Sequence, residues 1–310
     1  PPYSSAASDV YKRQNLKKKK LVDVVSNPEF LREGEAIRDF IYPDRVIIGT
    51  DSNKANRILK SLYFPIIKKK SRYFNTSRRG AELIKYASNA FLATKISFIN
   101  EIANLCEKTG VDIKDVSQGM GSDERIGDRF LRAGPAYGGS CFPKDTRALI
   151  DTGNKFKADL TIVKSVVNSN DNRKTLLIKR VVKILGGNLK NKIITFLGVT
   201  FKPNTDDMRE ATSIPMIKYL NKKNSKIKYY DPSGEKDDFK GLKNVNYCNT
   251  ISSACLNADM VILHTEWNDF KLLNFKKLVK KQKFKIYDMR NMYSPSRMKK
   301  LNIDYYAVGR

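Results

Sequence analysis

Cys141 has the surroundings most typical of a chemically active residue in this sequence. It follows the glycine-rich stretch 134–140 and precedes the Pro-Lys-Asp run at 143–145. Glycines let a ligand approach the backbone closely, and a proline followed by a helical pattern predicts that a helix begins beside Cys141. A helix N-terminus favours the thiolate, which is the nucleophilic form of cysteine. The remaining cysteines lie in apolar patterns typical of buried structural residues: Cys106, Cys248 and Cys255.

Two further groups of polar residues have a spacing that suits chemistry. Lys85 and Asn89 are four residues apart, so on a helix they share one face. Glu29 and Glu33 follow a strand-like segment, at the end where α/β enzymes keep functional groups, and could serve as general base and polar anchor. A solvent-facing lysine and helix-capping glutamates are the alternatives that these residues leave open.

A polar loop at 201–210 (Phe-Lys-Pro-Asn-Thr-Asp-Asp-Met-Arg-Glu) directly follows the predicted strand 193–199. At the carboxyl end of a parallel strand, the phosphates of a ligand would meet loop amides and a cation. This loop therefore predicts a site for a phosphorylated ligand.

The whole chain is strongly basic, because 59 Lys and Arg residues against 32 Asp and Glu give a formal net charge of +27. Such a charge attracts polyanions, so nucleic-acid binding is one hypothesis. The lysines are spread along the chain without interleaved aromatic residues, which favours a solvated basic surface. A positive field also suits a small phosphorylated substrate, so charge alone does not separate these classes.

The 310 residues suggest about two domains. Four cysteines without a Cys-x-x-Cys pair indicate neither a disulfide framework nor a structural zinc site, so we expect no metal. No apolar run reaches the roughly 18 residues of a membrane helix, and the N-terminus has no signal-peptide core. We therefore expect a cytoplasmic protein.

The elements that must position these residues alternate between strands and helices. Strands are predicted at 21–26 and 45–49, and a helix at 53–62. Apolar residues then recur at three and four positions throughout 80–109, which predicts one helix roughly 40 Å long that Gly110 ends. A helix of this length connects domains or packs against a partner chain.

Residues 111–145 predict a short helix and then the glycine-rich stretch, and 146–185 predict more helix with an interruption at 151–157. After these, β-rich runs alternate with helical patterns at 193–199, 227–230, 260–264, 285–288 and 305–308. This rhythm predicts an α/β fold with a doubly wound parallel sheet.

Six motifs, in one order along the chain, resemble the UDP-glucose/GDP-mannose dehydrogenase family, which oxidises the C6 alcohol of a nucleotide sugar to a carboxylate with two NAD⁺. They are Asn-Pro-Glu-Phe-Leu-Arg-Glu-Gly from residue 27, the helix with Lys85 and Asn89, Gly-Gly-Ser-Cys-Phe-Pro-Lys-Asp from residue 138, the 201–210 loop, Thr-Glu-Trp at 265–267 and Asp-x-Arg-Asn at 288–291. The resemblance runs from about Asp23 to Arg310.

The residues around Cys141 and the Tyr-Pro-Asp-Arg run at 42–45 favour the UDP-glucose branch of this family. A dehydrogenase of another nucleotide sugar, GDP-mannose or a UDP-N-acetyl hexosamine, is the alternative. A basic nucleic-acid-binding protein on the same fold is the third hypothesis.

The resemblance implies three domains after a leader. They are a remnant of an N-terminal NAD-binding Rossmann domain at 21–75, a central long-helix dimerisation domain with the cysteine loop at 76–186, and a C-terminal UDP-binding Rossmann-like domain at 187–310. Residues 1–20 resemble nothing in the family, so we expect a disordered or artefactual leader.

The resemblance also implies catalytic roles for five residues. Cys141 would attack the C6 aldehyde to give a thiohemiacetal and then a thioester, which water hydrolyses. Lys85 and Asn89 would stabilise the oxyanions at C6. Asp145, with Glu29 acting through a water, would be the general base.

Binding residues are implied as well. The nucleotide sugar would contact Glu29, Phe30, Leu31, Arg32, Glu33, Lys85, Asn89, Arg125, Phe130, Leu131, Arg132, Ala133, Gly134, Gly138, Phe201, Lys202 and Arg290. NAD would contact Glu33, Lys144 and Arg209. Arg125 would reach the sugar of a neighbouring subunit in a homodimer formed through the long helix, and neither a membrane nor a specific nucleic acid is expected as a partner.

One part of the family pattern has no counterpart in this sequence. The family begins with a Gly-x-Gly-x-x-Gly turn and a later acidic residue that bind the adenosine half of NAD, and none of the 17 glycines has that spacing. We therefore expect an N-terminally truncated chain that lacks NAD-dependent turnover by itself.

Overall fold

The structure is a computed structural model that describes residues 22–67 and 72–310. The chain divides between Phe91 and Leu92 into two compact units, and each is described by itself. The predicted leader at 1–20 lies outside the described residues.

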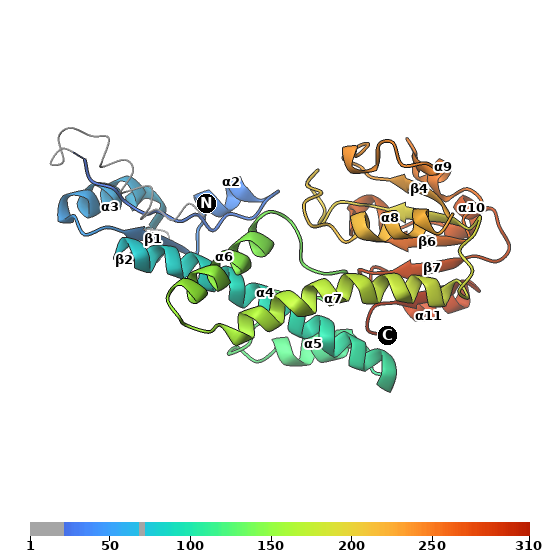
Figure 1. Ribbon diagram of the computed structural model, residues 1–310, viewed down its shortest axis with the longest axis horizontal. Coiled ribbons are helices and arrows are strands. Elements are labelled where there is room, and N and C mark those ends of the chain that lie inside the picture. The colour runs from blue at the N-terminus through green and yellow to red at the C-terminus, as the bar shows by residue number, and fades with distance from the viewer. Residues whose placement is uncertain (1–21, 68–71) are drawn as a thin grey trace. The chain divides into compact units, whose positions relative to one another are not determined.

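The first unit contains a two-stranded parallel sheet with short helices beside it (Figure 1). Its elements are α2 (Ala36–Ile41), β1 (Arg45–Gly49), α3 (Asn53–Ile67) and β2 (Arg72–Thr76). Strand β1 is a β-branched run whose last four residues are buried, and its predicted bounds are confirmed. Helix α3 confirms the helix predicted at 53–62 and extends it by five residues.

One expectation for this unit is wrong, and one strand was missed. No strand forms at 22–25, and Ser26 makes only an antiparallel bridge with Gly49. Val22 is 49% exposed. The strand is absent because β-branched residues favour a strand only where a neighbouring strand pairs with them. Strand β2 was not predicted, because its sequence Arg-Tyr-Phe-Asn-Thr is polar and half exposed, yet it pairs with all five residues of β1.

The long helix is confirmed as α4 (Arg78–Thr109), which begins in the first unit and continues into the second. Gly110 follows it with φ +73°, the left-handed conformation that ends helices and that glycine adopts without strain. The second unit continues with α5 (Ile113–Gly121), α6 (Cys141–Lys155) and α7 (Thr161–Ile184). The helical stretch is interrupted at 156–160, between α6 and α7, whereas the interruption was predicted at 151–157; residues 151–155 still belong to α6.

A six-stranded, fully parallel sheet forms the centre of the second unit. Its strands are β3 (Ile193–Leu197), β4 (Lys226–Tyr230), β5 (Val245–Tyr247), β6 (Met260–Leu263), β7 (Lys285–Asp288) and β8 (Asp304–Ala307). They lie in the order β5-β4-β3-β6-β7-β8, so the winding reverses between β3 and β6. In such sheets, ligands bind outside the carboxyl ends of the strands at that reversal. Five of the strands were predicted, and β5, only three residues long, was not.

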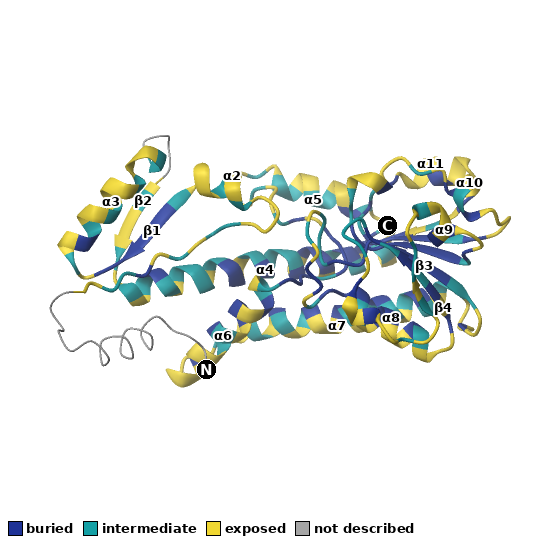
Figure 2. Ribbon diagram, turned by 90° about the horizontal axis from the view of Figure 1, so that it is seen from above, coloured by how far each residue is buried: buried dark blue, intermediate teal, exposed yellow. Residues whose placement is uncertain are grey.

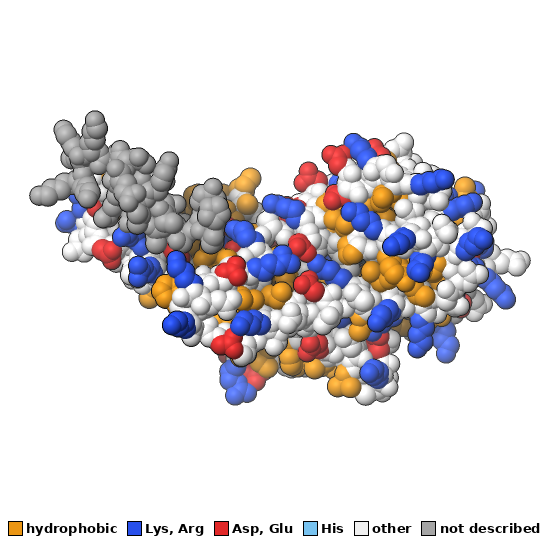
Figure 3. All heavy atoms as spheres, in the orientation of Figure 1, with side chains coloured by type: hydrophobic (Ala, Val, Ile, Leu, Met, Phe, Trp, Pro, Cys, Tyr) orange, Lys and Arg blue, Asp and Glu red, His pale blue; other side chains and the backbone are white. Residues whose placement is uncertain are grey.

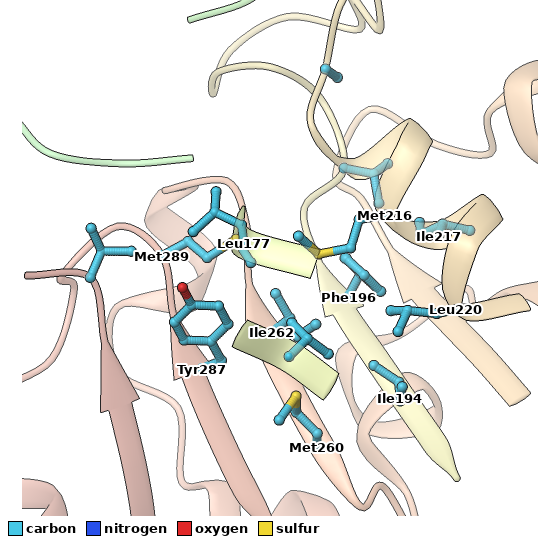
Figure 4. Close-up of a cluster of buried hydrophobic side chains, with 14 of the residues drawn as sticks. Leu177, Ile194, Phe196, Met216, Ile217, Leu220, Met260, Ile262, Tyr287 and Met289 are labelled. Atoms are coloured by element: carbon cyan, nitrogen blue, oxygen red, sulfur yellow. The ribbon is translucent and has the colours of Figure 1, made fainter. Parts of the chain in front are cut away.

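Side chains alternate between the two faces of this sheet, as the period of two in a strand requires. Ile194 and Phe196 point to one cluster of buried side chains, which α7 and α8 (Ser213–Lys222) cover (Figure 4). Val261 and Leu263 point to a second cluster. That cluster is covered by α9 (Ile251–Cys255), α10 (Phe275–Val279) and α11 (Pro295–Lys300). Short 3₁₀ turns at Asp237–Phe239 and Asn268–Phe270 complete the unit.

Candidate active site

Cys141 is the first residue of α6, as the position of Pro143 predicts. Its side chain is exposed, whereas Cys106 and Cys255 are buried and Cys248 is half-buried. Asp145 follows one helical turn later and is buried, with its Oδ1 atom 3.4 Å from the Nζ atom of Lys144. A thiol and a carboxyl group are therefore one turn apart at the start of one helix.

Two glycines before Cys141 pack closely against another segment of the same unit. A Cβ atom on Gly138 would lie 2.8 Å from the carbonyl oxygen of Glu210, and one on Gly139 would lie 2.7 Å from the Phe201 ring. Gly139 also has φ +76° and donates its amide to the carbonyl of Arg209 at 2.8 Å. The close approach that these glycines permit is thus made by the 201–210 loop of the same unit.

Several amides at the start of that loop are occupied by the protein itself. The Asp231 carboxylate, at the end of β4, accepts from the amides of Val199 at 2.7 Å and Thr200 at 3.4 Å. The amide of Phe201 donates to the carbonyl of Asp207 at 3.3 Å. These three amides bond within the protein and are not available to a phosphate.

Arg290 occupies the reversal of the sheet, just beyond β7. Its guanidinium donates to the carbonyls of His264 at 2.9 Å and Phe201 at 2.8 Å, and pairs with the Glu266 carboxylate at 2.8 Å. It also lies 3.2 Å from the place of a Cβ atom on Gly134. Three of the predicted substrate residues, Gly134, Phe201 and Arg290, therefore come together.

Lys202 adds a second cation next to this group, with its Nζ atom 5.3 Å from the centroid of the Phe201 ring. A lysine over an aromatic face is held by the ring quadrupole. The loop and β7 thus place two cationic groups beside Phe201.

The remaining predicted residues of this unit differ in how they are held. Phe130 has φ +65° and its ring lies 6.1 Å from that of Phe142, while Leu131 and Ala133 are buried and Arg132 is exposed. Arg125 is largely exposed and forms an ion pair with Asp123 two residues earlier.

Arg209, predicted to contact NAD, makes a two-pronged ion pair with the buried carboxylate of Asp207, at 2.8 and 2.9 Å. Its neighbour Glu210 accepts from Arg147 on α6 at 3.0 Å and from Lys174 on α7 at 2.7 Å. The hydrogen bond from Lys174, followed by that from Arg147, lowers the pKa of the Glu210 carboxyl.

The first unit brings together Glu29, Phe30 and Lys85. The Lys85 ammonium donates to the Glu29 carbonyl and lies 3.3 Å from the Glu29 carboxylate. The Phe30 ring has Lys85 on it at 5.2 Å and the Arg45 guanidinium at 4.1 Å. Asn89, one turn beyond Lys85 on α4, is buried.

The other residues of the 27–34 motif shape a turn before α2. The Leu31 amide donates to the Glu29 carboxylate at 2.7 Å, and Arg32 pairs with Asp39 at 2.7 Å. This hydrogen bond from Arg32 lowers the pKa of Asp39. Glu33 is exposed in the turn itself.

Sequence reasoning missed the buried polar side chains that hold the cysteine loop. Asn170 and Arg173 on α7 and Asn100 on α4 are all buried and bond to the backbone of residues 134–137. The available signal was a polar residue at an otherwise apolar position of a helix, which has to find a partner when it is buried. Glu210 was quoted in a motif but given no role.

Three models of one family match the chain. They are described as the NAD binding, central and UDP binding domains of the UDP-glucose/GDP-mannose dehydrogenase family, and they match residues 4–67, 79–172 and 195–295. The first match begins within the predicted leader. The matches follow the order of the predicted domains, whose exact boundaries stay a prediction.

Curated relatives of this family are similar over most of the chain. The UDP-glucose 6-dehydrogenase of Rickettsia felis is 45% identical over 290 residues, which is 93% of this chain and 65% of the relative. That of Rhizobium meliloti is 44% identical over 292 residues, 93% of this chain and 67% of the relative. The chain thus spans about two thirds of the length of these relatives.

Solved structures agree with these sequence relationships. A UDP-glucose dehydrogenase from Pyrobaculum islandicum is 32% identical with a TM-score of 0.85, covering 98% of this chain and 66% of that one. A UDP-D-ManNAc dehydrogenase from Pyrococcus horikoshii shares the fold at 22% identity, with a TM-score of 0.82 over 100% of this chain and 71% of its own. With the six motifs in order and the parallel sheet built as predicted, the chain belongs to the UDP-glucose/GDP-mannose dehydrogenase family.

Proposed function

We propose that the protein containing this chain oxidises the C6 alcohol of UDP-glucose to a carboxylate, with NAD⁺ as oxidant and Cys141 as nucleophile. The observation that carries the proposal is the exposed thiol of Cys141 on the first turn of α6, one turn before buried Asp145. The curated relatives named UDP-glucose 6-dehydrogenase support the choice of sugar nucleotide.

In this mechanism the sulfur of Cys141 forms a bond to the aldehyde carbon at C6, and the carbonyl becomes an oxyanion. Lys85 and Asn89 donate hydrogen bonds to that oxyanion. Two NAD⁺ molecules, bound one after the other, would supply the hydride acceptors, one for the oxidation of the alcohol to the aldehyde and one for the oxidation of the sulfur adduct to the thioester. Asp145, with Glu29, takes a proton from the water that then attacks the thioester, which releases the carboxylate and returns the thiol.

The described residues fit only part of an NAD site. Between β1 and α3 the Ser52 hydroxyl accepts from the Ala55 amide at 3.2 Å, and no Gly-x-Gly-x-x-Gly turn occurs there. Pyrophosphate binding in Rossmann domains needs open amides on such a turn. Glu33, Lys144 and Arg209 would contact the cofactor, while the described residues do not hold its adenosine half.

Binding of the UDP part is proposed at the reversal of the six-stranded sheet. Lys202 and Arg290 provide positive charge there, and Gly134 leaves room for the Arg290 guanidinium beside its backbone. A diphosphate suits such a pair of cationic side chains.

We also propose that α4 forms a homodimer interface with a second copy. Phe91, Phe98 and Leu105 recur every seven residues along this helix and are 66%, 46% and 56% exposed. Exposed apolar residues at heptad spacing are typical of a helix that packs on a partner. Sedimentation as a monomer at micromolar concentration would argue against this interface.

The basic surface does not favour the nucleic-acid alternative. On the face drawn in Figure 3, Lys and Arg side chains are interspersed with uncharged and acidic ones and form no continuous stripe. We expect DNA binding to be weak and to fade with salt.

None of the helices in 22–67 and 72–310 is long and apolar enough to cross a membrane. The four free cysteines support the proposed location in the reducing cytoplasm.

The decisive experiment measures NADH formation from UDP-glucose by the longest reading frame that contains this chain. Cys141→Ala should lower the rate of UDP-glucuronate formation by at least about a thousandfold. Cys106→Ala, at a buried cysteine on α4, is the control and should retain activity. Near wild-type UDP-glucuronate formation by the Cys141 variant would refute the nucleophile assignment.

A further inference from the structure

Two positions in the loop before Cys141 have their backbone bound by buried side chains of α4 and α7. At Gly134, the amide donates to the Asn100 side-chain oxygen at 2.9 Å, and the carbonyl accepts from the Arg173 guanidinium at 2.8 Å. Arg173 also donates to the backbone carbonyl of Asn100 at 3.0 Å, which ties α7 to α4 beside the loop. Both backbone groups of Gly134 are therefore satisfied.

Asn170 does the same for Tyr137. Its side-chain oxygen accepts from the Tyr137 amide at 2.9 Å, and its side-chain nitrogen donates to the Tyr137 carbonyl at 3.1 Å. The side-chain amide thus pairs with the backbone as a neighbouring strand would. Asparagine carries a donor and an acceptor on one short planar group, which this pairing requires.

The fixed backbone at Tyr137 is connected to Cys141 through side-chain packing. Tyr137 lies four residues before Cys141, and its ring packs edge-on against Phe142, with centroids 6.1 Å apart. Burial raises the pKa of Tyr137 to about 12, so its ring remains neutral in this packing. The Thr146 hydroxyl then bonds to the Phe142 carbonyl at 2.7 Å within the first turns of α6.

Burying the polar side chains of this network costs folding free energy. Asn100, Asn170 and Arg173 are only 2%, 4% and 5% exposed. Among the described residues no carboxylate forms an ion pair with Arg173, and burial lowers its pKa to about 10. A buried charge without a counter-ion stabilises a fold less than an apolar residue of similar size. The hydrogen bonds to the loop are thus what these side chains contribute.

We propose that Asn100, Asn170 and Arg173 are positioning residues for the proposed reaction: they fix the backbone of 134–137 and thereby place the Cys141 sulfur at C6 of the substrate. This inference rests on the proposed function. The first oxidation of the alcohol does not involve the sulfur, whereas capture of the aldehyde does. Misplaced sulfur therefore slows the second half of the reaction selectively.

The test substitutes Asn170→Leu, which has nearly the same shape but no hydrogen-bonding groups. Asn168→Leu, at an exposed position of the same helix, is the matched control. In the enzyme, the amount of C6 aldehyde trapped by hydroxylamine per NADH should rise at least about tenfold for Asn170→Leu and stay unchanged for Asn168→Leu. A merely less stable enzyme makes less of both products at an unchanged ratio.

Hydrogen exchange on this chain provides the second measurement. The Tyr137 amide should exchange at least about tenfold faster in Asn170→Leu than in Asn168→Leu, because its acceptor is gone. The positioning inference would be overturned, without affecting the proposed function, by either of two results for Asn170→Leu. One is unchanged exchange of the Tyr137 amide, and the other is faster exchange with an unchanged ratio of trapped aldehyde to NADH. A protein without substitutions that makes no NADH from UDP-glucose would instead refute the proposed function.

Discussion

The described residues contain two parallel sheets, both built from strands that are connected by helices, but the two sheets are buried to very different extents. All four residues of β6 are buried, because strands flank it on both edges and helices cover both faces. In the two-stranded sheet, Phe74 of β2 is 51% exposed, and α3 has a single buried residue, Ala55. Figure 2 shows this contrast between β3 and β4 on one hand and β2 and α3 on the other. The strands and helices of both sheets form where their sequence pattern favours them. The difference in burial therefore comes from the number of neighbouring strands and helices around each sheet.

The candidate site residues repeat this contrast. In the first unit, Lys85 is held by Glu29, which is half exposed, and by the ring of Phe30. In the second, the cysteine loop is held by the buried side chains of Asn170 and Arg173. Exposed ion pairs contribute little to rigidity, whereas buried hydrogen bonds are costly to break. The cysteine side of the site is thus the preorganised one.

The largest expected effect is a difference in hydrogen exchange between the sheets. The amide of Ile262 in β6 should exchange at least about a thousandfold more slowly than that of Phe74 in β2, because opening a central strand requires most of the second unit to unfold. Exchange measured by mass spectrometry or NMR on the same sample tests this. Equal protection of the two strands would remove the basis of the comparison.

Truncation of a central side chain should be the next largest effect. Ile262 is fully buried in the cluster drawn in Figure 4. Ile262→Ala should lower the free energy of unfolding of the second unit by about 2–5 kcal/mol, since the cavity cannot collapse in a packed sheet. Denaturant titration followed by circular dichroism measures the change. A loss below about 1 kcal/mol would mean that this core is loosely packed.

Acid should weaken the second unit through His264, the single histidine of the chain. Burial, with the nearby Arg290 charge, lowers its pKa to about 3, so the folded state keeps it neutral while the unfolded state binds a proton below about pH 6.5. Stability due to this group is complete above pH 6.5 and falls as the pH decreases. Between pH 6.5 and 5 the loss should be about 1.5–2 kcal/mol.

The control for this pH dependence is His264→Asn. The stability of this variant should depend less on pH between 6.5 and 5, because it lacks the imidazole that binds a proton in the unfolded state. The pKa of the Glu210 carboxyl is lowered, so this group stays charged in the folded state in that window. Unfolding curves at several pH values give the slope. An equal slope in the variant and in the original chain would assign the acid sensitivity to other groups.

The smallest expected effect is at the exposed edge of the first unit. Phe74→Ala removes a half-exposed ring and should change stability by less than about 1 kcal/mol. Thermal melting beside Ile262→Ala measures the two on one scale. A loss as large as that of Ile262→Ala would show that β2 is covered in solution by a surface that the exposure of its ring does not reveal.

Much of this molecule could be predicted from local pattern. The spacing of apolar residues predicted α4, Pro143 predicted the helix start at Cys141, and β-branched runs predicted β1 and β3. These features depend on near neighbours in the chain, whose geometry is fixed by the periods of helix and strand.

The failures share a different cause. The run at 22–25 has the composition of a strand but lacks a partner among the described residues, and β2 has a poor composition but obtains one. The close packing of Gly138 against the Glu210 carbonyl could not be predicted either. Each depends on which segment lies alongside, which is not a local property.

The sequence alone was enough to predict the elements that have a clear apolar period and to supply the set of motifs that identifies the family. Tertiary structure alone decided that Asp231 occupies the amides after β3 and that Asn170 holds the backbone of Tyr137. The reason is that hydrogen bonds between distant segments depend on distance and direction in space. A sequence records which groups can donate and accept, and only the folded chain brings a particular donor to a particular acceptor.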